Sequence, residues 1–494
     1  MSDFTTALVM MADWETMLAI VIGTVFGMII GALPGLGSVL AITIVLPFTF
    51  TMDQVPSIAL VLAIYCSSVY GGSLSAILIN TPGTPQSATT MLDGYPMTRR
   101  GEADLAIGWA TGASVFGGLF SAVVLIFAAP QLARFALGFG PIETFALICM
   151  ALTCIAGVSH GSLMKGLLAG VFGLFLATIG TDNMTGSVRF TFGFFDLSSG
   201  LALIPVLVGL FALAEVFSRL GEAVPSDTGP LARVRGMRFA PFREWYDRRV
   251  TMLRSAIIGT CVGVLPGTGA ATASFIAYAE AKRSGKYRDR FGEGEPEGLV
   301  ASETANNAVT GGALVPTLAL GIPGDAVTAV LMSTLIIQGI QPGVRLFIDY
   351  PEVMDAAFIA LIVCNIMLLV VGIPLSRMIL PILRMPEGLL MAGIVVLSLL
   401  GAWSVGGRMF DIYVALAFGI VGAVMRLVSV PVAPVIIGIV LAPMLEESLR
   451  QGLILTDNNF FAFFTTEHPI AIVLAIATLL ISAAALRTEF KSPD

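Results

Sequence analysis

The stretches Gly31-Ala-Leu-Pro-Gly-Leu-Gly37 and Gly263-Val-Leu-Pro-Gly-Thr-Gly269 decide how this chain folds. Each interrupts a long apolar run, and the two share the pattern Gly-x-Leu-Pro-Gly-x-Gly. Proline removes a backbone donor and glycine permits left-handed backbone, so a helix breaks at each point. The sequence therefore predicts two helical hairpins, the first broken at Leu33–Gly37 and the second turned at Pro266–Gly269.

The rest of the chain is too apolar for a water-soluble protein. Of its 494 residues, 56% are hydrophobic and 12% are charged, and its mean hydropathy is +0.92. Soluble domains carry about 25% charged residues. Runs such as Ala103–Pro130 and Ala356–Ile373 are long enough to cross about 30 Å of hydrocarbon. The sequence therefore predicts an all-α polytopic membrane protein with re-entrant hairpins and broken helices.

Basic residues concentrate around the second break. Between Arg219 and Arg290 lie 13 of the 26 Lys and Arg residues, in clusters at 233–254 and 282–290. Because basic loops stay cytoplasmic, both ends of the apolar stretch between these clusters are expected inside, so its hairpin is re-entrant. The flanks of the first break, residues 1–15 and 50–56, carry no Lys or Arg. That hairpin is expected to enter from outside.

The motifs recur in the same order in the two halves. Gly71-Gly72 is matched by Gly311-Gly312, and Pro82-Gly83 by Pro323-Gly324. Equivalent motifs with opposite charge bias indicate two inverted-topology repeats, an architecture of many secondary transporters. We expect a first transmembrane repeat at 15–220, a basic cytoplasmic linker at 221–253 and a second transmembrane repeat at 254–490.

A substrate site is expected where the helices break. Unwound backbone is tolerated at membrane depth only when it is buried in protein or lines an aqueous cavity. A helix that restarts there points free N–H groups at the cavity and favours an anion, such as a carboxylate. The alternative is a kinked packing helix without function. The residues expected to bind substrate are Asn80, Thr81, Pro82, Gly83, Thr84, Pro85, Gln86, Gly321, Ile322, Pro323, Gly324, Asp325, Gly35, Gly37, Gly267, Thr268 and Gly269.

Two acidic positions leave alternatives open. Asp325 could ligate Na⁺ or exchange a proton, or it could cap the helix that restarts after the second Pro-Gly pair. The polar segment Glu303–Asn307 could be a substrate or ion site, or a solvated helix start. Neither segment around the Pro-Gly pairs contains Lys or Arg. Backbone dipoles and a co-bound cation, Na⁺ or H⁺, are therefore expected to neutralise an anionic substrate. No metal ligand set can be named.

Other chemistries have little support. Gly157-Val-Ser-His-Gly161 matches the G-x-S-x-G nucleophile elbow, but it lies between apolar helices and not on a strand-to-helix turn. The sequence holds neither a phosphate-binding P-loop nor an H-E-x-x-H zinc motif. The five cysteines lie in apolar segments and are interpreted as buried thiols. The glycines upstream of each break are interpreted as helix-packing residues. We expect no enzyme activity, no organic cofactor and no nucleic-acid partner.

The paired breaks, Tyr70-Gly-Gly72 with Asn80-Thr-Pro-Gly-Thr-Pro85, and Gly311-Gly-Ala313 with Gly321-Ile-Pro-Gly324 resemble the large membrane subunit of the tripartite tricarboxylate transporters. The resemblance covers residues 15 to 488. It implies a multi-pass permease of the bacterial inner membrane for citrate-like carboxylates, driven by an ion gradient. It also implies two partners, a small membrane subunit and a periplasmic substrate-binding protein. A gated anion pore of similar fold is the alternative, and an intramembrane hydrolase is a weaker one.

Overall fold

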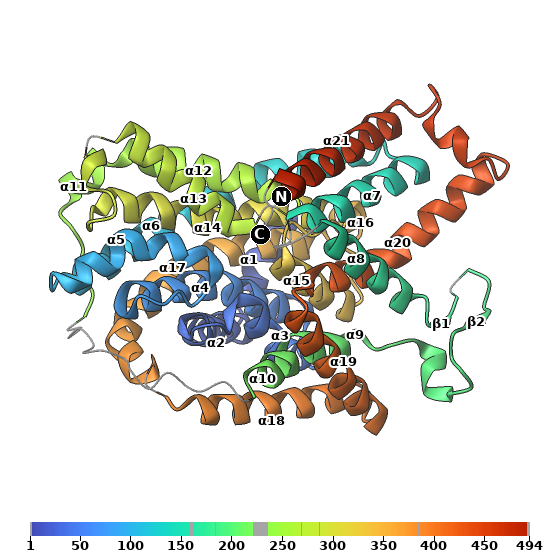
Figure 1. Cartoon of the computed structure of the whole chain (residues 1–494), viewed down its shortest axis with the longest axis horizontal. Helices are drawn as coiled ribbons and strands as arrows, with labels where there is room; N and C mark the ends of the chain where they lie inside the picture. The colour runs from blue at the N-terminus through green and yellow to red at the C-terminus, as the bar shows by residue number, and fades with distance from the viewer. Residues whose placement is uncertain are drawn as a thin grey trace.

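The computed structural model of the chain describes residues 2–158, 163–182, 184–220, 236–267, 269–285, 287–383 and 385–491. This part of the chain is almost entirely helical, with one two-stranded antiparallel pair (Figure 1). Six described helices are long and apolar enough to cross a membrane. The prediction of an all-α polytopic membrane protein is confirmed. The elements of the first half are α1 (Ser2–Ala12), α2 (Trp14–Ala32), α3 (Gly37–Thr49), α4 (Gln54–Ile79), η1 (Pro85–Ser87), α5 (Ala88–Arg99), α6 (Ala103–Ala136), α7 (Pro141–Val158), α8 (Leu163–Ala177), β1 (Gly180–Thr181), β2 (Val188–Arg189), η2 (Phe195–Ser199), α9 (Leu203–Leu207), the π-helical segment η3 (Val208–Leu213) and α10 (Ala214–Arg219).

The second half repeats much of this order. Its elements are α11 (Phe242–Asp247), α12 (Arg249–Val264), α13 (Gly269–Ser284), η4 (Arg288–Arg290), α14 (Pro296–Leu320), α15 (Ala326–Ile337), α16 (Val344–Asp349), α17 (Pro351–Leu383), α18 (Glu387–Gly406), α19 (Met409–Leu427), α20 (Ala433–Leu455), η5 (Phe460–Phe464) and α21 (Pro469–Lys491). The pairs α2–α3 and α12–α13 are the two predicted hairpins, and the arms of each contact one another. Helices α12 and α13 have 16 residues each, short of the about 20 that a crossing needs. That length fits the predicted re-entry of the second hairpin, whereas α2, with 19 residues, is long enough to cross. The side from which each hairpin enters stays a prediction.

Backbone geometry at the helix ends matches between the halves. Leu33, which ends α2, has φ −79° and ψ 120°; Leu265, which ends α12, has φ −81° and ψ 114°. Both precede a proline, which disfavours helical backbone at the preceding residue. Asn80 ends α4 with φ 55° and ψ 29°, and Gly321 ends α14 with φ 70° and ψ 24°. The duplication read from the motifs is therefore also a duplication of local structure.

Glycines upstream of each break pack helices together. A Cβ added at Gly23 or Gly27 would lie 2.6 or 2.8 Å from a backbone carbonyl oxygen of α4, and one at Gly31 would collide with the Ser68 carbonyl. In the second half, a Cβ at Gly263 would lie 2.8 Å from the Val309 carbonyl oxygen on α14. Small residues let backbones approach in this way. The packing interpretation of these glycines is confirmed.

The two halves exchange helices reciprocally. Helix α6 of the first half packs along α14 of the second, and α17 of the second packs along α4 of the first. Gly117 of α6 lies against the Thr304 backbone, while the Asn365 amide of α17 lies 3.9 Å from the Cys66 sulfur on α4. Likewise α7 and α8 pack on α20, and α18 and α19 pack on the α9–α10 segment. Because each half completes the other, neither half buries its central helix alone.

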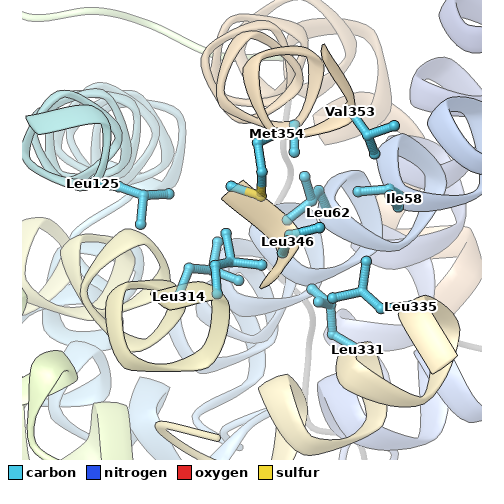
Figure 2. Close-up of a pocket in the computed structure, with 11 residues that line it drawn as sticks. Ile58, Leu62, Leu125, Leu314, Leu331, Leu335, Leu346, Val353 and Met354 are labelled. Atoms are coloured by element: carbon cyan, nitrogen blue, oxygen red, sulfur yellow. The ribbon is translucent and has the colours of Figure 1, made fainter. Parts of the chain in front are cut away.

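The crossing of the two halves has a dry apolar core. Figure 2 shows Ile58 and Leu62 of α4, Leu314 of α14, and Leu331 of α15 converging with other aliphatic side chains. The void between them is about 10 Å³, so it holds one water molecule at most, and its apolar walls offer water no partner. This region is packing and carries no polar ligand.

The cysteine interpretation needs one correction. Cys66 and Cys364 are buried, and Cys149 and Cys154 are partly buried, but Cys261 is exposed. Cys261 lies on the outer face of α12, where lipid rather than protein is the expected neighbour of an apolar membrane helix. Burial against protein depends on tertiary packing, which composition does not reveal.

A four-residue ion cluster fixes the hairpin β1–β2, which projects from one end of the molecule (Figure 1). Arg450 of α20 donates to Asp182 at 2.6 Å, and Arg189 and Arg450 each lie 2.6 Å from the Glu446 carboxylate. The hydrogen bond from Arg450 lowers the pKa of Asp182. The cluster therefore holds this hairpin against α20 at neutral pH.

We expect Gly31→Ala to destabilise the protein more than Gly37→Ala. At Gly31 the new methyl group collides with the Ser68 carbonyl, so α2 must move away from α4, which costs about 1–3 kcal/mol. At Gly37 a Cβ meets open space, and the cost is that of left-handed backbone alone, about 1–2 kcal/mol. Thermal melting in detergent measures both, and transport then reports the further role of Gly37. Equal melting temperatures for the two variants would contradict the packing assignment.

Candidate functional site

The two hairpin turns and the two Pro-Gly breaks meet at one cavity of about 460 Å³. The first half supplies Gly35–Leu40 and Gly83–Gln86 to its wall, and the second half supplies Gly267, Gly269–Thr272 and Asp325–Val327. Phe211, Glu215, Arg426, Ala433 and Ile437 complete the lining. Segments that are almost 290 residues apart in sequence thus share one wall.

Helix N-termini gather at this cavity. Helices α3, α13, α15 and α20 all begin at residues of the wall, as does η1. The first turn of α3 has no side-chain cap, and neither has that of α20. A helix N-terminus carries unpaired N–H groups and about half a positive charge. The uncapped starts of α3 and α20 therefore favour an anion, although the carboxylates of Glu215 and Asp325 also line the wall.

Two hydroxyl groups in the wall lack partners. Ser38 is 4% exposed and Thr84 is 2% exposed, and within the described chain neither Ser38 Oγ nor Thr84 Oγ1 has a hydrogen-bond partner. An unpaired buried polar group costs about 1–3 kcal/mol. Both oxygens are closed to solvent, and Thr84 Oγ1 lies against Gly72, so a ligand in the cavity would bond to them only after a small movement of the wall.

Charged residues reach the cavity from elements far from the breaks. Arg426, in the last turn of α19, forms an ion pair with Glu215 of α10. Arg219 donates to the same Glu215 at 2.6 Å, to Glu387 at 2.5 Å and to the Pro34 carbonyl at 3.0 Å. The first hairpin turn is thus held by an arginine. The sequence does not predict a basic residue here, and tertiary folding brings Arg426 to the wall, where it is paired with Glu215. The role of a co-bound cation stays a prediction.

Asp325 caps α15. Its Oδ1 accepts from the Thr328 backbone N–H at 2.7 Å, and the Thr328 hydroxyl donates to it at 2.9 Å. Its Oδ2 accepts from the Tyr65 hydroxyl at 2.8 Å. Of the alternatives for this residue, the capping role is confirmed. An ion role stays a prediction, since Asp325 also faces the cavity.

Several predicted residues lie away from the wall. Asn80 and Thr81 are exposed at the end of α4, and Pro82 is not among the lining residues. The segment Gly321–Gly324 is buried behind the wall. Thr268 lies outside the described residues. A break places only a few of its residues at the cavity, because the chain turns through it.

The backbone groups at the breaks are largely satisfied within the protein. The Gly83 N–H donates to the Gly72 carbonyl at 3.2 Å, and the Gly267 N–H donates to the Gly324 carbonyl at 2.8 Å. The Gly324 N–H donates to the Thr317 hydroxyl at 3.2 Å. These three N–H groups are therefore not free to bind a substrate, whereas the first turns of α3 and α20 have no side-chain cap. Binding of an anion by the helix starts stays a prediction.

Sequence reasoning missed Ser38, Glu215, Arg219 and Arg426. Ser38 directly follows the predicted turn residue Gly37, so its position was a usable signal. Arg219 and Arg426 each end an apolar helix, where a basic residue is ordinarily an interfacial anchor. Nothing in the sequence shows that they point at the first break.

Three candidates from the sequence remain: the Glu303–Asn307 segment, the G-x-S-x-G motif and a metal site. Glu303–Asn307 are fully buried in the middle of α14, which begins at Pro296, so the solvated helix start is wrong. Ser159 and His160, of the G-x-S-x-G motif, lie outside the described residues. In the part of the chain that the structure describes, no group of three or more His, Cys, Asp and Glu side chains could hold a metal ion.

Comparison with known proteins agrees with this architecture. Residues 17–437 match the model of the "Tripartite tricarboxylate transporter TctA family". A protein of Agrobacterium vitis, the "Uncharacterized 52.8 kDa protein in TAR-I ttuC' 3'region", is 37% identical over 95% of this chain and 93% of its own. A second from that organism, the "Uncharacterized protein in TAR-II ttuC' 3'region", is 34% identical over 47% of this chain and 96% of its own. No solved structure matches the chain.

Fold and cavity together define a multi-pass membrane protein whose helix breaks enclose an anion-suited site. The chain belongs to the tripartite tricarboxylate transporter TctA family. The resemblance read from its motifs is thereby confirmed. The family is one of transporters, so the chain is a membrane subunit of a tricarboxylate-type transporter.

We expect Ser38→Ala and Thr84→Val to weaken substrate binding, and Asn80→Ala to leave it unchanged. Losing one hydrogen bond to a charged ligand costs about 1.5–3 kcal/mol, which corresponds to at least about a ten-fold rise in the half-saturating concentration. Uptake of labelled citrate into proteoliposomes measures this value. Asn80→Ala is the matched control, because it alters the same break on its exposed side. Equal effects of Thr84→Val and Asn80→Ala would contradict the placement of the substrate site in the cavity.

Proposed function

We propose that the chain is the permease subunit of a binding-protein-dependent secondary transporter that takes up tricarboxylates or related organic acids across the bacterial inner membrane. A periplasmic binding protein delivers the substrate, a small membrane subunit accompanies the chain, and a gradient of H⁺ or Na⁺ drives uptake. One observation carries the proposal: helix N-termini from both halves line one cavity of about 460 Å³.

The chemistry of the cavity supports a carboxylate ligand. Ligand pockets span about 300–1,000 Å³, so this cavity has room for an anion of the size of citrate. Carboxylate oxygens would accept from the uncapped first turns of α3 and α20 and from the Ser38 and Thr84 hydroxyls. Arg426 would offset part of the charge, and it can exchange its partner Glu215 for the substrate.

The arrangement of the halves supports alternating access. In transporters with inverted repeats, the substrate lies at midplane between discontinuous helices of the two repeats. Here the wall is shared by the equivalent breaks of the two halves, which also exchange their long helices α6 and α17. A gated anion pore is the remaining alternative, and it would require one continuous polar path.

Counterflow separates these two functions. Proteoliposomes holding the chain with its small membrane subunit and binding protein are loaded with unlabelled citrate and given labelled citrate outside. A transporter accumulates the label transiently above its equilibrium value, because exchange outpaces net flux, and we expect this overshoot. Simple equilibration without overshoot would support the pore. Repetition with a panel of di- and tricarboxylates identifies the preferred substrate.

We expect a cysteine at Arg243 to be labelled from the cytoplasmic side alone. Arg243 lies in the basic segment that precedes α12 and is exposed, and basic segments stay cytoplasmic. The experiment uses a membrane-impermeant maleimide on oriented vesicles, in a background with the exposed Cys261 replaced by serine. Ala12→Cys, before the first hairpin, is the matched control and should react from the opposite side. Labelling of both positions from one side would contradict the inverted repeats.

A further inference from the structure

One carboxyl group in the centre of the molecule has no role in the site described above. Glu303 is the eighth of the 25 residues of α14 and is 0% exposed. The Ser73 hydroxyl donates to its Oε1 at 2.6 Å, the Thr90 hydroxyl donates to the same oxygen, and the Ser114 hydroxyl donates to its Oε2 at 2.9 Å. Three different helices, α4, α5 and α6, thus each bring one hydroxyl to this carboxyl group.

No cation faces Glu303 among the described residues. From α4 comes Tyr70, whose hydroxyl is bonded to Thr111. From α5 comes Asp93, whose oxygens are taken by Tyr278 and by backbone N–H groups of the 292–295 loop. The titratable residues of α6 are Asp104 and Arg134, ten residues before and twenty after Ser114. On α14 itself the other acid is Glu297.

The chemistry of this cage suits a group that gains and loses a proton. A charged carboxylate buried without a cation is very costly, whereas a neutral acid is not. Serine and threonine hydroxyls can donate to a carboxylate, or turn and accept from a carboxylic acid. An arginine partner would fix the charged form, but three hydroxyls pair with either form. The cage can therefore hydrogen-bond to Glu303 in either protonation state.

Unpartnered polar atoms continue from the cage along both helices. Within the described chain, Thr304 Oγ1, both polar side-chain atoms of Asn306 and Asn307 Oδ1 are buried without a partner on α14. Thr89 Oγ1, next to Thr90 on α5, is in the same state. Water molecules bound to such atoms can relay a proton. A proton route to the cage, which the proposal below requires, would run past these atoms.

The cage is also joined to the cavity through one short segment. Pro85 and Gln86 line the cavity, η1 continues into α5 without a gap, and Thr90 is the third residue of α5. A ligand that draws η1 inward shifts Thr90, one of the donors to Glu303. This continuous segment is the path that coupling between the cavity and Glu303 would use.

We propose that Glu303 is the proton-binding site that couples transport to a proton gradient, with Ser73, Thr90 and Ser114 as its positioning residues. This inference rests on the proposed transport function. A proton from the outer water forms an O–H bond with the Glu303 carboxylate as substrate binds. That bond breaks when the site opens to the inside, and the proton passes to the inner water with the substrate.

The first test needs no substrate. Infrared spectra of the purified chain at neutral pH should show the carbonyl band of a protonated carboxylic acid, which shifts in D₂O. We expect Glu303→Gln to remove this band and Glu143→Gln to retain it. Glu143 is a matched control, because it is a buried carboxyl that lies far along the chain and is paired with His468 and the Gly140 N–H. A band that persists in Glu303→Gln overturns the proposal.

The second test measures coupling in proteoliposomes that hold the partner subunits. With one proton per cycle and the membrane potential held at zero, a pH gradient of one unit supports about a ten-fold accumulation of labelled citrate. Glu303→Gln should abolish this accumulation and keep citrate counterflow, and Thr90→Val should shift its pH dependence. Accumulation driven by Na⁺ alone, or a pH-driven accumulation that survives in Glu303→Gln, overturns the proposal. Wild-type liposomes without counterflow would instead reject the transport function, and the infrared band still decides the protonation of Glu303.

Should Glu303→Gln fail to fold, the wild-type spectrum remains informative. The band of the protonated acid should disappear as the pH is raised. The pH at which half of the band is lost should differ between wild type and Thr90→Val. Ser121→Ala, which removes another α6 hydroxyl bonded within its own helix, is the control for this variant. A midpoint that is equal in wild type, Thr90→Val and Ser121→Ala overturns the assignment to Glu303.

Discussion

A peptide group in hydrocarbon has no water to bond, and every helix break in a membrane protein must therefore find partners inside the protein. In this chain the breaks bond to one another and to the helices beside them. The Gly267 N–H reaches the Gly324 carbonyl, and the Gly83 N–H reaches the Gly72 carbonyl. These bonds require the break segments to lie together in the interior. The shared cavity follows from that requirement, because turns that converge leave their helix starts around a common space.

Close helix packing makes this convergence possible. Gly27 and Gly31 bring α2 onto α4, and Gly259 and Gly263 bring α12 onto α14, at distances that no larger side chain allows. Each hairpin is thus fixed to the central helix of its own half. The long helices α6 and α17 then cross to the other half. Each hairpin therefore packs on a helix that carries buried polar residues.

Charge in the interior is arranged in two ways. At the cavity, Glu215 is paired with both Arg219 and Arg426, so that side of the wall can exchange partners without leaving a charge alone. At Glu303 there are hydroxyl groups and no cation among the described partners. The arginines paired with Glu215 can also bind an anionic ligand. The three hydroxyl groups around Glu303 can bond to it in either protonation state. The segment from Pro85 to Thr90 joins the two environments.

The sequence by itself determined the membrane class, the two helical hairpins, the internal duplication and the family, because hydropathy, Pro-Gly breaks and repeated motifs are local properties of the chain. It also placed Gly35, Thr84, Gln86 and Asp325 at a common site. Tertiary structure decided which residues of each break face the cavity, turning Asn80 and Thr81 outward and burying Gly321–Gly324 behind the wall. It alone brought Arg219, Arg426 and Glu215 to the first hairpin, and three hydroxyls to Glu303. These contacts join residues roughly 200 positions apart, and no local pattern specifies the partner of a side chain at that separation.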